Sequence, residues 1–370
     1  MLEGELREIG LEDIGLDDQG FLFATLPGNV PEAPVFGLLA HLDTSPDAPG
    51  AGVEPIVHRD YDGGRIELPR GGTVLDPERM PELAARAGHD LITSSGDTLL
   101  GADDKAGVAE VVTAVAHLAA HPELPRATVR VGFTPDEEVG LGGTRFDLER
   151  FGAPCAYTLD GSEPGELQDE TFSALAAEIT IEGVAVHPGF ATGKLVNATR
   201  LAARIVAALP AELTPERTRD REGFIHVQRT EATAERAVIS AIVRDFDEDA
   251  LAAHAALLRG TAEAIVAEEP RARVQVAITR QYTNMRRHLD AHPEVVAAAE
   301  EAMRREGHAP RRVPIRGGTD GSILSARGLP TPNLFTGGHE FHSTREWASV
   351  QEMAAAAAVA VRLAQVWAEA

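Results

Sequence analysis

Histidine and carboxylate side chains, the groups that bind borderline and hard divalent cations, are concentrated in five short segments of this chain. The residues are His41, Asp43, Asp103, Asp104, Glu137, Glu138, Asp160 and His342. Most of them directly follow a short apolar run that predicts a buried strand, whereas the aspartate pair precedes a helical pattern. Because ligands collect outside the carboxyl ends of the strands of a doubly wound sheet, we expect the five segments to meet at one rim. The pattern predicts a metal site at this rim.

Taken singly, each segment has an ordinary structural explanation. A His-x-Asp such as 41–43 is more often a polar surface turn, and an acidic pair such as 137–138 is usually a solvated loop. Aspartates at 103–104 favour the start of a helix through its dipole. The segments occur together, however, and most lie beside glycine-rich turns. That combination favours a shared site.

The charge and the cysteine content exclude several classes of protein and of metal site. The chain has 370 residues, enough for two or three domains, and 58 acidic against 34 basic side chains give a net charge of −24. Such a charge repels nucleic acid and anionic lipid, so we expect neither as a partner. The single cysteine excludes a disulfide framework and a multi-thiolate metal site, so a metal would be held by His, Asp and Glu.

Two further observations bear on location. The longest unbroken apolar run, 353–361, is too short to span a membrane. The first residues, Met-Leu-Glu-Gly-Glu, are acidic and lack the basic and apolar regions of a signal peptide. We expect a cytoplasmic protein.

The elements that would position these residues alternate between strand and helix. Strand-like runs cover 35–40, 128–133, 156–159 and 332–336, and a helical pattern covers 104–120. This alternation predicts an α/β fold with a doubly wound, mostly parallel sheet.

Between residues 172 and 283 the order of elements changes. Strands are expected at 175–181, 224–228, 237–243 and 274–278, and helices at 198–209 and 248–268. The order β-α-β-β-α-β is the ferredoxin-like arrangement. We therefore expect a catalytic domain formed by 1–171 and 284–370, with an inserted α+β domain at 172–283.

Eight segments resemble the signature segments of the peptidase T family, the zinc aminotripeptidases among the co-catalytic di-zinc exopeptidases. They are 41–47 (His-Leu-Asp-Thr-Ser-Pro-Asp), 101–107 (Gly-Ala-Asp-Asp-Lys-Ala-Gly), 133–140 (Phe-Thr-Pro-Asp-Glu-Glu-Val-Gly), 158–161, 186–189, 242–247, 314–321 and 333–338. The likeness runs through nearly the whole chain in the family's order. It implies release of the N-terminal residue from tripeptides, and a lid and dimerisation role for the insert.

The resemblance also implies two zinc ions per subunit. Carried over residue by residue, His41 and Asp160 hold one ion, Glu138 and His342 hold the other, and Asp103 bridges them. Glu137 is then the general base, and Asp43 orients the ring of His41. The family implies a cis peptide bond after Asp103. His339 is a rival for the last ligand position, but the match after 335–338 favours His342 and leaves His339 as a loop residue near the mouth of the site.

Residues of the insert and a glycine-rich turn are expected to bind the substrate. The resemblance makes His187 a donor to the scissile carbonyl oxygen, reaching across from the partner subunit of a homodimer. Arg244 or Arg316 would bind the carboxylate of a short peptide, because arginine grips carboxylates with two hydrogen bonds. An ion pair with Asp245 or Asp247 is the structural alternative for Arg244. Asn197 and Lys194 are further expected substrate contacts.

Three alternative functions are open: two are enzymes that use the same metal chemistry, and one is not catalytic. A related di-zinc dipeptidase or N-deacylase would use the same ligands, although Asp160 argues against the deacylases, which more often have glutamate there. The family usually has a helix before the point where this chain starts, so we expect a missing N-terminal piece. A catalytically inactive, truncated peptide- or metal-binding relative is therefore the third reading, and an intact Glu137 weighs against it.

Overall fold

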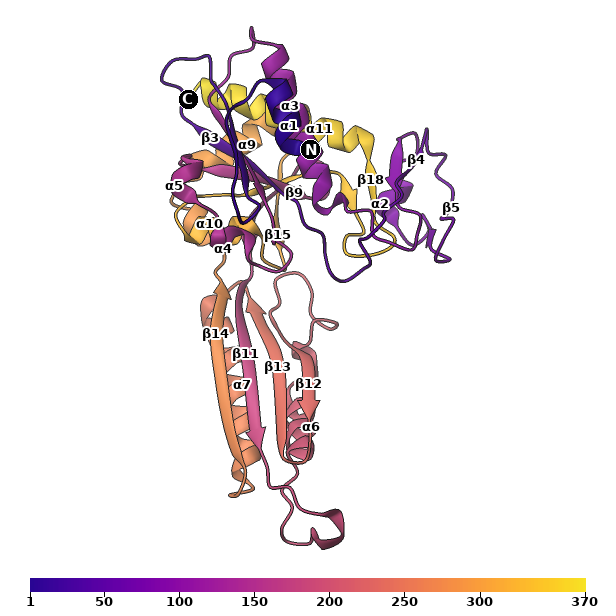
Figure 1. Ribbon diagram of the computed structural model, residues 1–370, viewed down its shortest axis with the longest axis vertical. Helices are drawn as coiled ribbons and strands as arrows, with labels where there is room; N and C mark the ends of the chain where they lie inside the picture. The colour runs from indigo at the N-terminus through magenta and orange to yellow at the C-terminus, as the bar shows by residue number, and fades with distance from the viewer. The chain divides into compact units, whose positions relative to one another are not determined.

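The computed structural model describes residues 1–370, which form two compact units (Figure 1). Unit 1 consists of Met1–Glu170, Met285–Pro314 and Thr319–Ala370. Unit 2 consists of Thr171–Asn284 and Ile315–Gly318. The five segments with metal-binding side chains all belong to unit 1.

Unit 1 is built on an eight-stranded sheet. Its strands, in order across the sheet, are β1 (Glu12–Leu16), β2 (Leu22–Leu26), β8 (Val129–Thr134), β3 (Phe36–His41), β9 (Ala156–Gly161), β16 (Asn333–Phe335), β10 (Glu166–Thr171) and β15 (Arg311–Ile315). The four central strands, β8, β3, β9 and β16, run parallel, whereas β1, β2 and β10 pair antiparallel. The predicted α/β fold with a mostly parallel sheet is confirmed.

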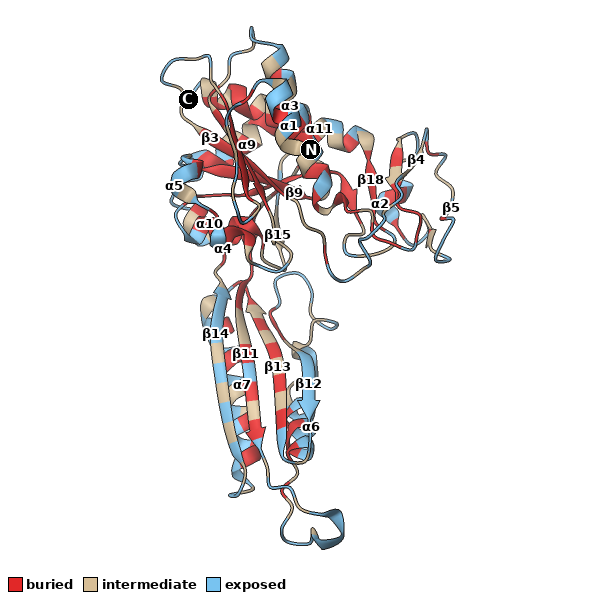
Figure 2. Ribbon diagram, in the orientation of Figure 1, coloured by how far each residue is buried: buried red, intermediate tan, exposed pale blue.

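Helices pack against this sheet on both sides (Figure 1). α3 (Ala102–Ala120) lies on β3 and β9 and packs against α11 (Val350–Ala368), which in turn contacts α9 (Pro293–Arg305). α4 (Gly142–Arg145), α5 (Leu148–Phe151) and α10 (Asp320–Ala326) lie on the other side, around a core of aromatic rings. The remaining helices of unit 1 are α1 (Leu2–Ile9), α2 (Pro81–Ala84) and α8 (Arg286–Leu289). Figure 2 shows the central strands as the most deeply buried part of the chain.

Two small sheets of unit 1 were not predicted. One contains β17 (Gly338–His339), β18 (Trp347–Ser349), β7 (Leu91–Thr93) and β4 (Ile56–His58), and the other pairs β5 (Ile66–Glu67) with β6 (Val74–Leu75). Strands of two or three residues are too short to show an alternating pattern. Tertiary contacts, above all the packing of the buried Trp347, hold them in place.

Unit 2 has one antiparallel sheet covered by two helices. Its elements are β11 (Ser173–Glu182), η1 (Pro188–Phe190), α6 (Ala198–Ala208), η2 (Ala211–Leu213), β12 (Phe224–Ala232), β13 (Arg236–Asp245), α7 (Glu248–Ala267) and β14 (Arg273–Tyr282). The order across the sheet is β12-β13-β11-β14, with all three pairings antiparallel. The residues of β13 alternate between buried and half-buried, so one face of the sheet packs on α6 and α7 (Figure 2).

One helix of unit 2, α7, is long and apolar enough to cross a membrane by length and composition alone. Core helices also pass this test, and the face of α7 that carries Leu251, Leu258 and Ile265 is buried in the core of unit 2.

Candidate metal centre

Three neighbouring strands of unit 1 bring ligands to the same edge of the sheet. β3 lies between β8 and β9 and ends at His41, a buried residue whose register partner on β8 is Thr134. The chain leaving β8 therefore carries Glu137 and Glu138 past this edge, and Asp160 lies at the end of β9. The strand ends meet as expected for parallel neighbours.

Asp103 lies between two histidines. Its Oδ1 is 2.9 Å from Nε2 of His41, and its Oδ2 is 3.1 Å from Nε2 of His342. Nε2 of His41 is also 3.8 Å from Oδ1 of Asp160, and Nε2 of His342 is 3.1 Å from Oε2 of Glu138. The carboxylate of Asp103 thus lies between the two histidines, and ligand atoms of His41, Asp103 and Glu138 form one group that could hold a metal ion.

Asp43 holds the loop that follows β8. Its two carboxylate oxygens accept hydrogen bonds of 3.0 Å from the backbone N–H groups of Glu137 and Glu138, and Oδ1 lies 3.4 Å from Nδ1 of His41. Nδ1 of His41 is also 3.2 Å from the carbonyl oxygen of Asp43. Asp43 therefore positions both the imidazole ring and the acidic pair.

Glu137 is held from a second side. Its Oε1 accepts a hydrogen bond of 3.2 Å from the backbone N–H of Asp320, the first residue of α10. The buried carboxylate of Asp320 accepts from the hydroxyl of Thr134 at 2.7 Å and from the N–H of Gly143 at 2.5 Å. Asp320 had no assigned role in the sequence, although it lies in the Gly-Gly-Thr-Asp-Gly segment that carries the family resemblance.

Asp104 is a second residue that sequence reasoning did not assign. It is buried, and its carboxylate accepts from the N–H of His41 at 2.9 Å and from that of Gly107 at 3.3 Å. One oxygen of Asp104 can also group with His41 and Asp160 as a set of potential metal ligands. The peptide bond between Asp103 and Asp104 is cis, as the resemblance implies.

The protonation of these side chains is strongly coupled to their neighbours. Burial opposes charge on His41, but its hydrogen bonds with Asp103 and Asp43 raise the pKa of His41 well above its ordinary value. Burial likewise acts to raise the pKa of Asp103, and the two histidines hold it well below the ordinary value. Hydrogen bonds with Asp103 and Glu138 raise the pKa of His342 to about 10.

Two other carboxyl groups have a raised pKa, in contrast to Asp103. Burial, with the charges of Asp104 and Asp103 next in importance, raises the pKa of Asp160 well above its ordinary value. Burial and the neighbouring Asp320 raise the pKa of Glu137 to about 8. Many carboxylates share a small volume here, so they need compensating positive charge.

The chemistry of these residues fits divalent cations. The ligand atoms lie 2.9 to 3.8 Å apart, close to the separation of about 3.4 Å between two ligands of one tetrahedral zinc ion. Oε1 of Glu138 is buried and has no hydrogen-bond partner. Imidazole and carboxylate are zinc ligands, and cations would supply the compensation that protons on the histidines otherwise supply.

Comparison with known proteins identifies the family of this chain. A model of the family described as Peptidase family M20/M25/M40 matches residues 99–366. The chain is also 48% identical to a peptidase T of Aeromonas hydrophila over 98% of its own length and 89% of that protein. The chain belongs to the peptidase T family.

Solved structures are similar in fold. Aminopeptidase PepT from Bacillus cereus superposes with a TM-score of 0.77 at 26% identity, covering 99% of this chain and 91% of that one. A tripeptidase from Staphylococcus aureus gives a TM-score of 0.81 at 21% identity, covering 100% and 92%. The second likeness supports the fold alone.

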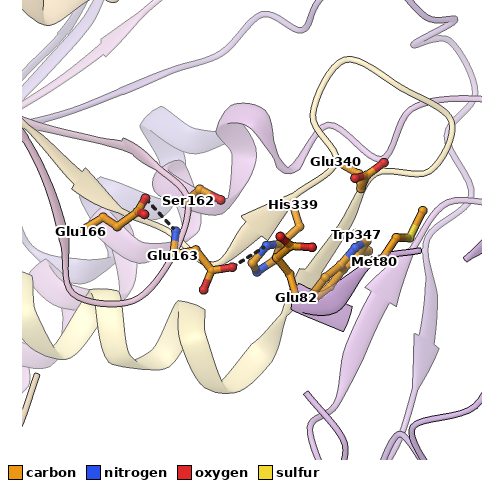
Figure 3. A pocket seen from close by; sticks show the side chains of 8 residues that line it. All are labelled: Met80, Glu82, Ser162, Glu163, Glu166, His339, Glu340 and Trp347. Carbon is orange, nitrogen blue, oxygen red and sulfur yellow. Dashed lines mark hydrogen bonds and ion pairs between the residues drawn. The ribbon is translucent and has the colours of Figure 1, made fainter. Parts of the chain in front are cut away.

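His339 is the one ligand rival that the structure places elsewhere. It lies on β17 rather than in a loop at the mouth, is 4% exposed, and its Nε2 is 2.9 Å from Oε2 of Glu352. Its ring stacks on Trp347 with 4.0 Å between ring centroids, and its Nδ1 is 3.5 Å from Glu163 (Figure 3).

Figure 3 shows the pocket that His339 lines, a cavity of about 340 Å³ in unit 1. Its lining residues are Met80, Glu82, Ser162, Glu163, Glu166, His339, Glu340 and Trp347. None of the family's ligand positions is among them. The lining of this pocket thus contains none of the proposed metal ligands.

The two predicted arginines of unit 2 differ in their partners. Nη2 of Arg316 donates to the hydroxyl of Thr218 at 2.9 Å and Nη1 to the carbonyl oxygen of Asp220 at 3.1 Å. Arg244 makes one long contact, 3.4 Å from Nη1 to the carbonyl oxygen of Arg316, and its buried Nε has no partner.

Arg244 does not form the ion pair that was its structural alternative. Asp245 instead lies 3.1 Å from Nε2 of His254, and Asp247 caps α7 by accepting from the N–H of Ala250. The guanidinium of Arg244 lies over aromatic rings of unit 2, 5.9 Å from the ring of Phe224. Arg244 is thus the arginine that retains hydrogen-bonding capacity.

Of the other predicted substrate residues in unit 2, two lie at N-cap positions and one lies in a turn. His187 is exposed, and its Nδ1 accepts from the N–H of Gly189 at 3.1 Å at the start of η1. Lys194 is exposed. Asn197 caps α6, accepting from the N–H of Arg200 at 3.2 Å, so its side chain has a structural role.

Proposed function

We propose that this chain is a metal-dependent aminopeptidase that releases the N-terminal residue of tripeptides. The observation that carries the proposal is the carboxylate of Asp103, whose two oxygens each face a different histidine. A carboxylate shared in this way serves two cations at once. The family of this chain, and the name aminopeptidase carried by the Bacillus cereus structure at 26% identity, support the same type of reaction.

We assign two zinc ions to this cluster. His41 and Asp160 would hold one ion, and Glu138 and His342 would hold the other. Asp103 would bind both ions. When bound, such a pair polarises the scissile carbonyl group and makes water a stronger nucleophile at neutral pH. Three carboxylates and two neutral imidazoles leave a negative site, which attracts divalent cations.

Glu137 is the proposed general base. Its Oε1 is taken up by the N–H of Asp320, which leaves Oε2 to accept a proton from the attacking water and return it to the departing amine. Asp43 keeps Glu137 in place through the backbone and fixes the tautomer of His41. Asp43 is thus a positioning residue in this scheme.

For substrate recognition we propose Arg244 as the partner of the peptide's C-terminal carboxylate. Its guanidinium has no carboxylate partner in unit 2, whereas that of Arg316 is occupied by Thr218 and Asp220. His187 as donor to the scissile carbonyl from the partner subunit of a homodimer, and contacts from Lys194 and Asn197, stay predictions. We also propose a cytoplasmic location, since the single, buried and unpaired Cys155 suits a reducing compartment.

Hydrolysis of three peptides by the zinc-loaded chain tests the proposal. We expect cleavage of a free tripeptide, and none of its N-acetylated form or of the matching dipeptide. Cleavage of the acetylated peptide would instead indicate an N-deacylase, and cleavage of the dipeptide a dipeptidase. The variant Glu137→Gln should bind the same number of zinc ions and lose at least about 100-fold in kcat. If wild type binds zinc and cleaves none of the three, the chain is an inactive relative.

A further inference from the structure

Glu346 is a buried carboxylate that binds three backbone N–H groups at the start of α3. Its Oε2 accepts from Leu100 at 2.8 Å and from Gly101 at 2.7 Å, and its Oε1 accepts from Asp103 at 2.9 Å. The residue is 1% exposed. One side chain, distant in sequence, therefore holds the segment that carries Asp103.

The N–H groups that Glu346 binds precede the regular part of α3. The backbone is not helical at Asp103 (φ −85°, ψ 99°) or at Asp104 (φ −123°, ψ 34°), and Asp104 accepts from the N–H of Gly107 at 3.3 Å, as an N-cap residue does. Because Leu100, Gly101 and Asp103 lie outside the regular helix, their N–H groups need an acceptor from elsewhere, and Glu346 supplies it.

Glu346 also belongs to the loop that carries His342. This loop connects β17 and β18, which pair through Gly338 with Ala348 and His339 with Trp347. His342 has a φ of 58°, a left-handed backbone conformation that persists only where the surroundings hold it. Glu346 fixes the far end of the loop to α3.

We infer that Glu346 positions Asp103 relative to His342 and thereby shapes the site of the cation that these two side chains share. Oδ2 of Asp103 and Nε2 of His342 are 3.1 Å apart but come from separate segments, which Glu346 joins. Both oxygens of Glu346 are occupied by N–H donors, so Glu346 is a positioning residue and not a ligand. The inference rests on the proposed metal centre.

Titration of the metal-free chain with Co²⁺ tests it, because the visible absorption of bound Co²⁺ reports ligand geometry. We compare wild type with Glu346→Gln, whose amide nitrogen would face N–H donors. The matched control is Glu352→Gln, since Glu352 is also buried but accepts from Arg86 and lies 2.9 Å from His339, without bonding the segment of Asp103.

Wild type and the control should bind two Co²⁺ with the same spectrum. Glu346→Gln should fold, as judged by circular dichroism, and bind one of the two ions about 10–100-fold more weakly with a changed spectrum. Equal affinity and an unchanged spectrum in a folded variant would overturn the inference. Failure of wild type to bind two ions would overturn the metal centre itself.

A second variant covers the case in which Glu346→Gln does not fold. Glu346→Asp keeps the charge at the start of α3 but is one methylene shorter, so it should fold and still bind Co²⁺ more weakly than wild type. Wild-type binding by this variant overturns the inference. If neither variant folds, Glu346 is only a structural cap, and the inference is equally overturned.

Discussion

A buried glutamate of α3 should make the free energy of unfolding depend on pH by an amount that can be calculated. Glu110 is 1% exposed, and neither of its carboxylate oxygens has a hydrogen-bond partner. Burial, together with the charge of Asp104, raises the pKa of Glu110 well above its ordinary value. The folded protein therefore keeps this carboxyl protonated at pH values where the unfolded chain ionises it, since an unfolded glutamate has a pKa of about 4.3.

The direction of this pH dependence follows from the number of protons that the folded and the unfolded state bind. Above about pH 4.3 the folded state binds one more proton at Glu110 than the unfolded state, so the free energy of unfolding falls as pH rises. The loss is about 1.4 kcal/mol for each pH unit over which the folded carboxyl stays protonated. Glutamine at this position is neutral at every pH. We therefore expect the difference in unfolding free energy, Glu110→Gln minus wild type, to rise with pH, by about 1.4 kcal/mol for each unit over which the folded carboxyl stays protonated.

Urea unfolding of the metal-free chain at pH 5, 6 and 7 measures this difference. The two tryptophans, Trp347 and Trp367, are both buried in unit 1, so their fluorescence reports the unfolding of the unit that contains α3. With a urea dependence of about 3 kcal/mol per M, the midpoint of the variant should move by about 0.5 M per pH unit relative to wild type. Any cost of burying the amide is the same at each pH and leaves this slope unchanged.

An exposed glutamate of unit 1 provides the control. Glu8→Gln should change the unfolding free energy by nearly the same small amount at all three pH values, because Glu8 is exposed. A difference for Glu110→Gln that stays flat between pH 5 and 7 would show that the folded carboxyl is ionised, and would refute the reasoning.

Three further substitutions test the site. Asp43→Asn places an amide nitrogen against a backbone N–H group of the acidic pair, so zinc affinity measured by chelator competition should fall about 10–100-fold, and unchanged affinity would contradict the positioning role. Gly107→Ala puts a Cβ 2.0 Å from the carbonyl oxygen of Leu159, so the free energy of unfolding of unit 1, measured in urea, should fall by about 1–3 kcal/mol. The control Gly4→Ala meets nothing within 4 Å and should not lower it. Arg244→Met removes charge-assisted hydrogen bonds of about 1.5–3 kcal/mol, so kcat/KM for a tripeptide should fall about 10–150-fold. The kcat/KM for the C-terminal amide of the same tripeptide should change little. An equal loss for both peptides would speak against a carboxylate contact.

The convergence of the metal-binding side chains on one rim of the sheet could be predicted from the sequence, because most of their segments follow a strand-like run. The proposed division of these side chains between two ions rests instead on the family resemblance. β3 reads as an uninterrupted apolar run that ends at His41, and the acidic pair follows β8 in the same way. Parallel neighbours place their carboxyl ends together, so strand ends predict a shared rim before any coordinates are known. The order of strands and long helices along the insert, β-α-β-β-α-β, was predicted from the sequence and matches β11, α6, β12, β13, α7 and β14.

Tertiary structure alone decided which residues support these ligands. Nothing near Glu346 in the sequence marks it as the acceptor for Leu100, Gly101 and Asp103, because the hydrogen bonds join segments more than 240 residues apart. The choice between Arg244 and Arg316 likewise depended on which guanidinium already had partners. Local pattern determines which side chains reach the end of a strand, whereas long-range packing determines which polar groups remain available for chemistry and which are used to hold the others in place.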